Sequence, residues 1–226
     1  MGSTARARLS RRARARLAAE GGFTLPELLV TMAILLIVVA SLASVLVSAT
    51  RSQVDASARF QAQGQARAGL NQLRRELHCA SAVTQTSGTA LTAGTAYNAI
   101  SLTLSSVCPT TGGTSLFATW CTSASTLTTG DFALYRVTST STPPTCATSG
   151  KVKWADYLQP TTLGPPPAST PFCLPSTSAA CGGVLKPTTS LPMLHVVLPV
   201  NLNGPTSTKD GYNLVDDIAL RNGTRS

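Results

Sequence analysis

The chain has 226 residues, of which 43% are hydrophobic and only 12% charged, and its formal net charge is +9. This length suits one globular domain with a long helix rather than several domains. The low charged fraction and the abundance of Thr, Ser, Ala and Gly favour an exported β-rich domain over a cytosolic enzyme.

The first 22 residues form a basic leader. They contain six arginines and one glutamate, a balance of +5, which leaves +4 for residues 23–226. A basic segment directly before an apolar helix is the positive-inside signal, so we expect the amino terminus in the cytoplasm. Arginine-rich arms also bind nucleic-acid phosphates, but the position of this one beside an apolar segment favours a role in topology. The remaining +4 permits weak DNA contact without demonstrating it.

An uncharged apolar run follows the leader. Between Glu27 and Arg51 lie 23 residues without a charge, mostly Leu, Ile, Val and Ala. A helix of that length reaches about 34 Å, enough to cross a hydrocarbon core roughly 30 Å thick. Glu27 is unusual there, because a carboxylate in a bilayer costs about 2.5–3.5 kcal/mol at mid-depth and less near the edge. The sequence therefore predicts a membrane-spanning helix whose carboxylate needs a partner.

The start of this run resembles the processing motif of type IV pilins and type II secretion pseudopilins: Gly22-Phe23-Thr24-Leu25-Pro26-Glu27-Leu28-Leu29. The resemblance implies that a prepilin peptidase cuts after Gly22, that Phe23 becomes the N-methylated first residue, and that Glu27 serves filament assembly. It further implies other pilin or pseudopilin subunits and an inner-membrane assembly platform as partners, with membrane lipid around the helix before assembly. Pro26 stands where the family usually has Ile, Leu or Val, and proline is tolerated in a first helical turn.

Cleavage at this point gives Glu27 a partner. It leaves a positive amine on Phe23, one helical turn earlier, and within a helix bundle in lipid the two groups neutralise each other inside one subunit or between neighbours. Removing one partner of such a desolvated pair typically costs about 3–5 kcal/mol. The pair would fix the axial register of one subunit on the next. A lone glutamate lying among lipid headgroups is the alternative, and it leaves the rest of the motif unexplained.

An ordinary signal peptide is the competing export route. Ser10-Arg11-Arg12 faintly resembles a twin-arginine signal, and Val47-Ser48-Ala49 has the small residues of a signal-peptidase site. The product would be a secreted or membrane-anchored β-rich adhesin, starting at Thr50 if it is cut there. The apolar run is longer than the roughly 7–15 residues of a signal-peptide core, which favours the pilin-type interpretation.

The helix is predicted to continue beyond the membrane segment, to residue 79. Apolar residues recur there at spacings of three and four, which predicts an amphipathic helix packed on a sheet: Val54, Ala58, Ala62, Ala66, Leu70, Leu73 and Leu77. Gly64 and Gly69 each weaken a helix by about 1 kcal/mol relative to alanine, so we expect local bending or melting there.

Residues 80–226 are predicted to form an antiparallel β-sheet domain, which makes the fold class α+β. Runs of β-branched or alternating residues predict strands at 100–104, 117–121, 132–138, 194–198 and 212–220. Long loops rich in Pro, Gly and Thr are expected at 142–150, 160–175 and 199–211. The predicted organisation is a leader at 1–22, a membrane and filament-core helix at 23–50, its amphipathic continuation at 51–79, and the exported domain at 80–226.

Two further segments carry a second resemblance. Residues 73–82 and 211–222 are similar to the matching segments of J-type minor pseudopilins and related minor pilins. This implies a minor subunit, and the presence of Glu27 argues against the tip subunit of such filaments, which lacks the assembly glutamate. The middle of the chain resembles no named family.

All six cysteines follow the membrane segment: Cys79, Cys108, Cys121, Cys146, Cys173 and Cys181. An even number in an exported region predicts disulfides, and six cysteines allow 15 pairings. The short separations favour Cys108–Cys121 and Cys173–Cys181, leaving Cys79 with Cys146. A zinc site is disfavoured, because the chain has no Cys-x-x-Cys and only His78 and His195 could join the ligands.

The sequence carries no catalytic or phosphate-binding motif, such as Gly-x-Ser-x-Gly or His-Glu-x-x-His, and we expect neither an enzyme nor a cofactor. His195 is expected to point outward from its strand. Asp216 and Asp217 are adjacent in a strand and should point to opposite faces, which disfavours a calcium site. Trp120 and Trp154 are expected in the core or at its rim.

Overall fold

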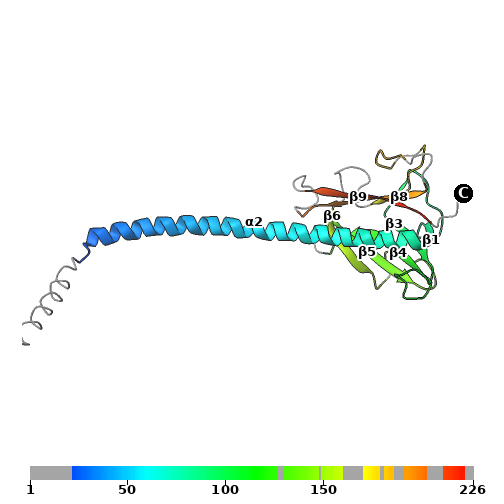
Figure 1. Cartoon of the computed structure of the whole chain (residues 1–226), viewed down its shortest axis with the longest axis horizontal. Helices are drawn as coiled ribbons and strands as arrows, with labels where there is room; N and C mark the ends of the chain where they lie inside the picture. Colours follow the sequence, from blue (N-terminus) through cyan, green and yellow to red (C-terminus); the bar gives the residue numbers. More distant parts are fainter. Residues whose placement is uncertain are drawn as a thin grey trace, which may run out of the picture. The chain divides into compact units, whose positions relative to one another are not determined.

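The computed structural model describes residues 22–126, 130–147, 149–159, 170–178, 181–185, 191–202 and 211–221. The chain divides into two compact units, Met1–Asp55 and Ala56–Ser226, and each is considered by itself. One long helix, α2 (Leu25–Cys79), contributes to both units, and nine strands of the described residues belong to the second (Figure 1). The predicted α+β fold is confirmed. The predicted leader lies outside the described residues except for Gly22.

In the first unit, α2 is a helix with apolar residues on all sides. Every described residue from Gly22 to Asp55 is exposed, including the large side chains of Leu36 and Ile37. The helix is long and apolar enough to cross a membrane. A helix that is hydrophobic all round is stable only where lipid or other protein covers it.

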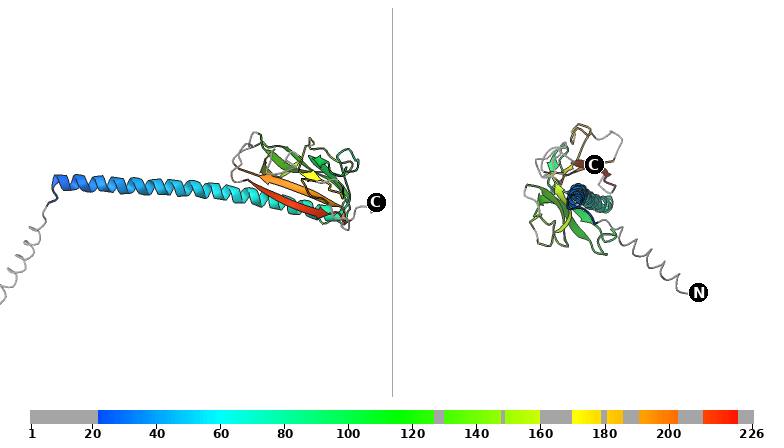
Figure 2. Two further views of the ribbon diagram at one scale, coloured as in Figure 1. Left: turned by 90° about the horizontal axis from the view of Figure 1, so that it is seen from above. Right: turned by 90° about the vertical axis from the view of Figure 1, so that its left-hand side faces the viewer.

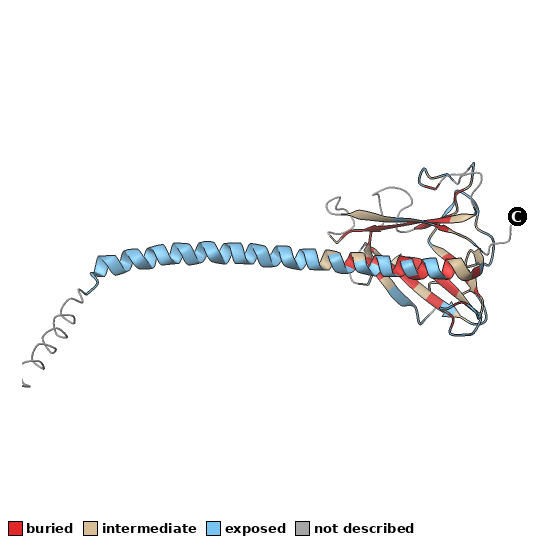
Figure 3. Cartoon of the chain, viewed as in Figure 1, coloured by how far each residue is buried: buried red, intermediate tan, exposed pale blue. Residues whose placement is uncertain are grey.

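In the second unit, α2 has one buried face. Ala62, Ala66, Leu70, Leu73 and Leu77 are buried at spacings of three and four, which confirms this part of the predicted stripe (Figure 3). The helix continues without interruption through both glycines, so the predicted melting is wrong. At Gly69 the glycine has a packing role, because a Cβ there would lie 3.2 Å from the Cβ of Trp154.

The strands are β1 (Ala80–Thr84), β2 (Ala96–Tyr97), β3 (Ala99–Leu104), β4 (Leu116–Ala124), β5 (Phe132–Ser139), β6 (Val152–Leu158), β7 (Phe172–Cys173), β8 (Met193–Val200) and β9 (Tyr212–Ala219). The five predicted strands correspond to β3, β4, β5, β8 and β9. The sequence did not indicate β1, which follows the helix with no turn residue between, or the two-residue strands β2 and β7. Strand β6 was not predicted either. Its polar residues and its irregular register with β5 interrupt the alternation of apolar and polar residues that is typical of a strand. Within the predicted loops, β7 and the end of β8 are strands.

The strands form one antiparallel sheet in the order β1-β3-β4-β5-β6-β8-β7-β2, with β9 paired to β8. The sheet curls around the last turns of α2, so that the strands lie beside the helix in both views of Figure 2. The core between them contains Trp120, Phe172 and the buried leucines of α2, β3, β5 and β8. A smaller cluster of Cys121, Ala133 and Tyr135 lies on the outer face of β4 and β5.

Three disulfides connect the domain: Cys79–Cys108, Cys121–Cys146 and Cys173–Cys181. Only the last of these pairings was predicted, and the predicted Cys108–Cys121 and Cys79–Cys146 pairs are wrong. In the β3–β4 hairpin, Cys121 lies opposite Ala99 at one end, while Cys108 follows Leu104 at the other. Five residues of strand between these ends span about 17 Å, far beyond the Cα separation that a disulfide permits.

Candidate functional site

The candidate assembly site lies at the amino end of α2. Gly22, Phe23 and Thr24 precede the helix, which begins at Leu25. The carbonyl of Thr24 accepts the first helical hydrogen bond, from the Leu28 N–H at 3.1 Å. Pro26 is therefore the second helical residue, a position whose backbone N–H has no partner within a helix. The departure from the family pattern at Pro26 thus costs the helix no hydrogen bond.

Glu27 occupies the first turn of α2. The unpaired N–H groups of that turn carry a partial positive charge, which favours a carboxylate there. Gly22, Phe23 and Glu27 are all exposed, so the peptide bond between Gly22 and Phe23 is accessible from outside the first unit. The structure places the three predicted site residues within one short segment at the start of the apolar helix.

Four hydroxyl groups of the apolar segment are satisfied within the helix itself. They donate to backbone carbonyls three or four residues earlier: Thr31 to Leu28 at 2.9 Å, Ser41 to Val38 at 2.8 Å, Ser44 to Ser41 at 2.7 Å, and Thr50 to Leu46 at 3.0 Å. A hydroxyl without a partner is costly in an apolar environment. These bonds make the segment compatible with lipid despite its serines and threonines.

Small residues gather on one side of the same segment. Ser44, Ser48 and Ser52 follow one another at intervals of four, and with Ala49 and Val45 they line a shallow hollow on the helix. Small residues at this spacing let two helices approach closely in a membrane. This face of α2 is suited to contact with another helix.

In the second unit, a buried ion pair joins α2 to the sheet. Glu76 is 0% exposed, and its Oε1 lies 2.7 Å from Nη2 of Arg136 on β5. Its Oε2 accepts a hydrogen bond from the Trp120 indole N–H on β4, also at 2.7 Å, and the Gln72 amide donates to Oε1 at 3.1 Å. Because its partners come from α2, β4 and β5, this cluster fixes the rotation of the helix on the sheet.

The sequence analysis missed this cluster, although the sequence holds a signal for it. Glu76 lies between Leu73 and Leu77, inside the apolar stripe. Arg136 follows Leu134 by two residues, so both side chains lie on the core-facing side of their strand. Two opposite charges, each in a pattern of buried residues, indicate a buried pair. Trp120 is in the core and Trp154 is partly buried, as expected, with ring centroids 5.7 Å apart.

The two aspartates of β9 do point to opposite sides. Asp216 accepts hydrogen bonds from Arg74 of α2, from Nε at 2.9 Å and from Nη2 at 2.6 Å. Asp217 lies 2.6 Å from Nδ1 of His195, its cross-strand neighbour on β8. His195 points away from the core that Leu194 and Val196 enter, as expected, although the residue is buried there, with 3% exposed. Its neighbours Cys173 and Asp217, on β7 and β9, flank it.

Within the described ranges, no three His, Cys, Asp or Glu side chains gather closely enough to hold a metal ion. The described cysteines are all paired in the three disulfides. His78 lies in the last turn of α2.

Residues 17–43 match the family model described as the prokaryotic N-terminal methylation motif. The match covers Gly22, Phe23, Glu27 and much of the apolar run, and it ends within the first unit. No curated protein and no solved structure matches the chain. The motif and the apolar helix, the one candidate span within the described ranges, support a type IV pilin-like subunit that is anchored in the membrane. Proteins of the pilin type are structural components of filaments, not enzymes.

Proposed function

We propose that this chain is the precursor of a minor subunit of a type IV pilus-like or pseudopilus filament. A prepilin peptidase cuts it after Gly22, Phe23 is N-methylated, and α2 then carries the subunit into the filament. The observation that carries the proposal is the match of residues 17–43 to the methylation motif, continuous with an exposed apolar helix that has Glu27 in its first turn. The J-type minor pseudopilins are the subclass that the two ends of the mature chain resemble.

Assembly follows from the surface of the first unit. Before assembly, lipid covers the exposed apolar residues of α2. In the filament, helices of neighbouring pilin or pseudopilin subunits replace the lipid, and the face with Ser44, Ser48 and Ser52 allows close approach. The new amine on Phe23 pairs with Glu27 of the same or a neighbouring subunit. Because a desolvated charge is stable only with its partner, this pair sets the axial register.

The proposed topology places the arginine-rich leader in the cytoplasm and the second unit outside the cytoplasmic membrane. The balance of +5 in the leader, next to an apolar span, favours this orientation. The three disulfides of the second unit favour an oxidising compartment. An inner-membrane assembly platform is the expected partner for extraction of the subunit from lipid.

Intact-mass analysis of the exported protein tests the processing step. We expect loss of residues 1–22 and one added methyl group on Phe23. A product that begins at Thr50 would instead establish the secreted adhesin with an ordinary signal peptide. Retention of the leader on exported protein would also overturn the proposal.

Glu27→Ala tests the assembly step. We expect the variant to insert into the membrane normally and to be lost from sheared filaments, because the Phe23 amine lacks its counter-charge. Glu27→Gln should fail in the same way, since it keeps the shape and removes the charge. Asp55→Ala, which removes an acid from the same helix beyond the apolar run, is the matched control and should assemble. Equal incorporation of wild type and Glu27→Ala would contradict the proposed pair.

A further inference from the structure

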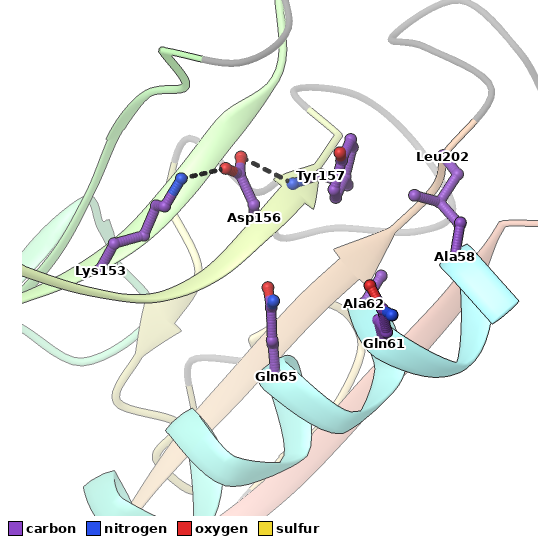
Figure 4. A pocket seen from close by; sticks show the side chains of 8 residues that line it. All are labelled: Ala58, Gln61, Ala62, Gln65, Lys153, Asp156, Tyr157 and Leu202. Atoms are coloured by element: carbon purple, nitrogen blue, oxygen red, sulfur yellow. Dashed lines mark hydrogen bonds and ion pairs between the residues drawn. The ribbon is translucent and has the colours of Figure 1, made fainter.

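A pocket of about 270 Å³ lies in the second unit between α2 and the end of β6 (Figure 4). Its lining combines an apolar part with a polar part: Ala58, Gln61, Ala62 and Gln65 from α2, Lys153, Asp156 and Tyr157 from β6, and Leu202 after β8. The filament function proposed above uses none of these residues.

The acid in the pocket wall is buried, and its carboxylate already accepts three hydrogen bonds within the protein. Asp156 is 1% exposed and accepts hydrogen bonds from Lys153 Nζ at 2.6 Å, Ser125 Oγ at 2.6 Å and the Tyr157 N–H at 3.0 Å. Burial raises the pKa of Asp156, but the hydrogen bonds outweigh it and hold the pKa below its usual value of 3.8. The hydrogen bond to Asp156 raises the pKa of Lys153. Both groups are charged at neutral pH and cancel each other, so this wall has no net charge.

Other polar groups of the lining remain available. Gln61 and Gln65 lie one turn apart on α2, are exposed, and make no side-chain hydrogen bond to any residue in the described ranges. In Figure 4 the Gln65 amide points from the helix toward the Lys153–Asp156 pair. Lys153 has further N–H groups besides the one given to Asp156, and each glutamine offers two. Each glutamine amide also carries an oxygen that accepts, so the pocket presents both donors and acceptors.

Tyr157 has an unusual backbone. With φ of 60°, it is the only non-glycine residue in the described part of the chain in the left-handed region. Two contacts hold it there: its N–H donates to Asp156, and its carbonyl accepts from the Asn201 N–H at 2.9 Å. Strained residues of this kind persist where surrounding contacts fix them, and they concentrate at ligand-binding sites. The conformation places the Tyr157 side chain in the pocket lining, near Leu202 (Figure 4).

We propose that this pocket binds one ring of a neutral saccharide. The neutral wall disfavours a ligand with net charge, and the mixture of donors and acceptors favours a ligand rich in hydroxyl groups, which both donate and accept. Ala58, Ala62 and Leu202, with the Tyr157 ring, supply an apolar surface for the C–H groups of a sugar ring. A bound peptide strand is disfavoured, because the end of β6 is already paired: Leu158 with Val200, and the Tyr157 carbonyl with Asn201.

The test uses the full chain in a detergent without a sugar headgroup, so that the detergent does not occupy the pocket. The probes are glucose, galactose, mannose and N-acetylglucosamine, each examined by saturation-transfer-difference NMR. We expect transfer to the ring C–H protons of at least one probe. The peptide Ala-Ser-Ala is examined in parallel. Transfer to no sugar, or to the peptide alone, overturns the proposal. Because the chain is tested unassembled, the result is independent of the filament function.

Two variants locate the binding. Gln65→Leu should weaken binding at least fivefold, because it removes an amide from the pocket. Tyr157→Gly should abolish binding while the second unit stays folded, because glycine adopts positive φ without strain and so offsets part of the packing lost with the ring. Asn71→Leu, at an exposed polar position elsewhere on α2, is the matched control and should bind as wild type. Unchanged sugar binding in both Gln65→Leu and Tyr157→Gly would place the sugar elsewhere and overturn the proposal.

Discussion

The two halves of α2 share one backbone geometry and differ in where their apolar side chains lie (Figure 3). In the first unit Leu36 is 69% exposed, and in the second Leu73 is 0% exposed. The difference follows from the pattern along the helix. The first half is apolar on all sides, so one face against a sheet could not cover it. The second half has a single apolar stripe, and the sheet buries it from Ala62 to Leu77, while Val54 at its start is exposed.

This contrast separates two sources of stability within one helix. The second half is stabilised by contacts inside the chain, and its residues should determine the unfolding of the second unit. The first half receives its cover from lipid or from other helices, so its residues should affect membrane insertion and assembly. Substitutions in the second half should therefore change the free energy of unfolding of the second unit, whereas substitutions in the first half should change membrane insertion and assembly.

Glu76→Ala should have the largest effect on folding. It leaves Arg136 largely buried without its carboxylate and takes the acceptor from Trp120. We expect the free energy of unfolding to fall by about 3–5 kcal/mol. Urea unfolding followed by tryptophan fluorescence measures this, because both tryptophans lie in the second unit. Asn71→Ala, at an exposed position on the same helix, should change it by less than about 0.5 kcal/mol.

A paired substitution sharpens this prediction. Glu76→Met together with Arg136→Met replaces the ion pair by apolar side chains of similar length, and it should recover most of the lost stability. Wild-type stability in Glu76→Ala alone would show that the cluster does not hold the helix on the sheet.

Leu73→Ala and Leu36→Ala form a matched pair across the two halves. Leu73→Ala creates a cavity in the core and should reduce the free energy of unfolding by about 2–5 kcal/mol. Leu36→Ala makes the same chemical change on an exposed surface and should leave the unfolding of the second unit within about 0.5 kcal/mol of wild type. The same urea titration of the full chain in detergent compares them. Equal losses in both variants would contradict the division of roles along α2.

The two helical glycines should respond to alanine with opposite signs. At Gly64 a Cβ meets nothing within 4 Å, so Gly64→Ala should stabilise the second unit by about 1 kcal/mol through helix propensity. At Gly69 a Cβ would lie 3.2 Å from the Cβ of Trp154 and 3.3 Å from Leu134 Cδ2. Overpacking there should exceed the gain in propensity and leave a net loss of about 1 kcal/mol. Thermal unfolding monitored by circular dichroism measures both, and stabilisation by both alanines would exclude a close approach at Gly69.

Many features of the molecule could be predicted from local patterns in the sequence. The methylation motif, the 23-residue uncharged run, the apolar stripe from Ala62 to Leu77 and five of the strands each depend on residues close together in the chain. Such patterns are set by helix and strand periodicity and by turn residues, and these act over a few positions. For the same reason the sequence placed Gly22, Phe23 and Glu27 within one segment.

The tertiary structure decided what depends on segments far apart in the chain. Sequence separation favoured Cys108–Cys121, but the length of the β3–β4 hairpin keeps these two apart and brings Cys108 to Cys79. The Glu76–Arg136 contact and the burial of His195 likewise depend on which strands the curled sheet places beside α2 and β8. The pocket at Tyr157 requires three elements to meet. Periodicity assigns a side chain to a face, and only the packing of the whole sheet determines what that face contacts.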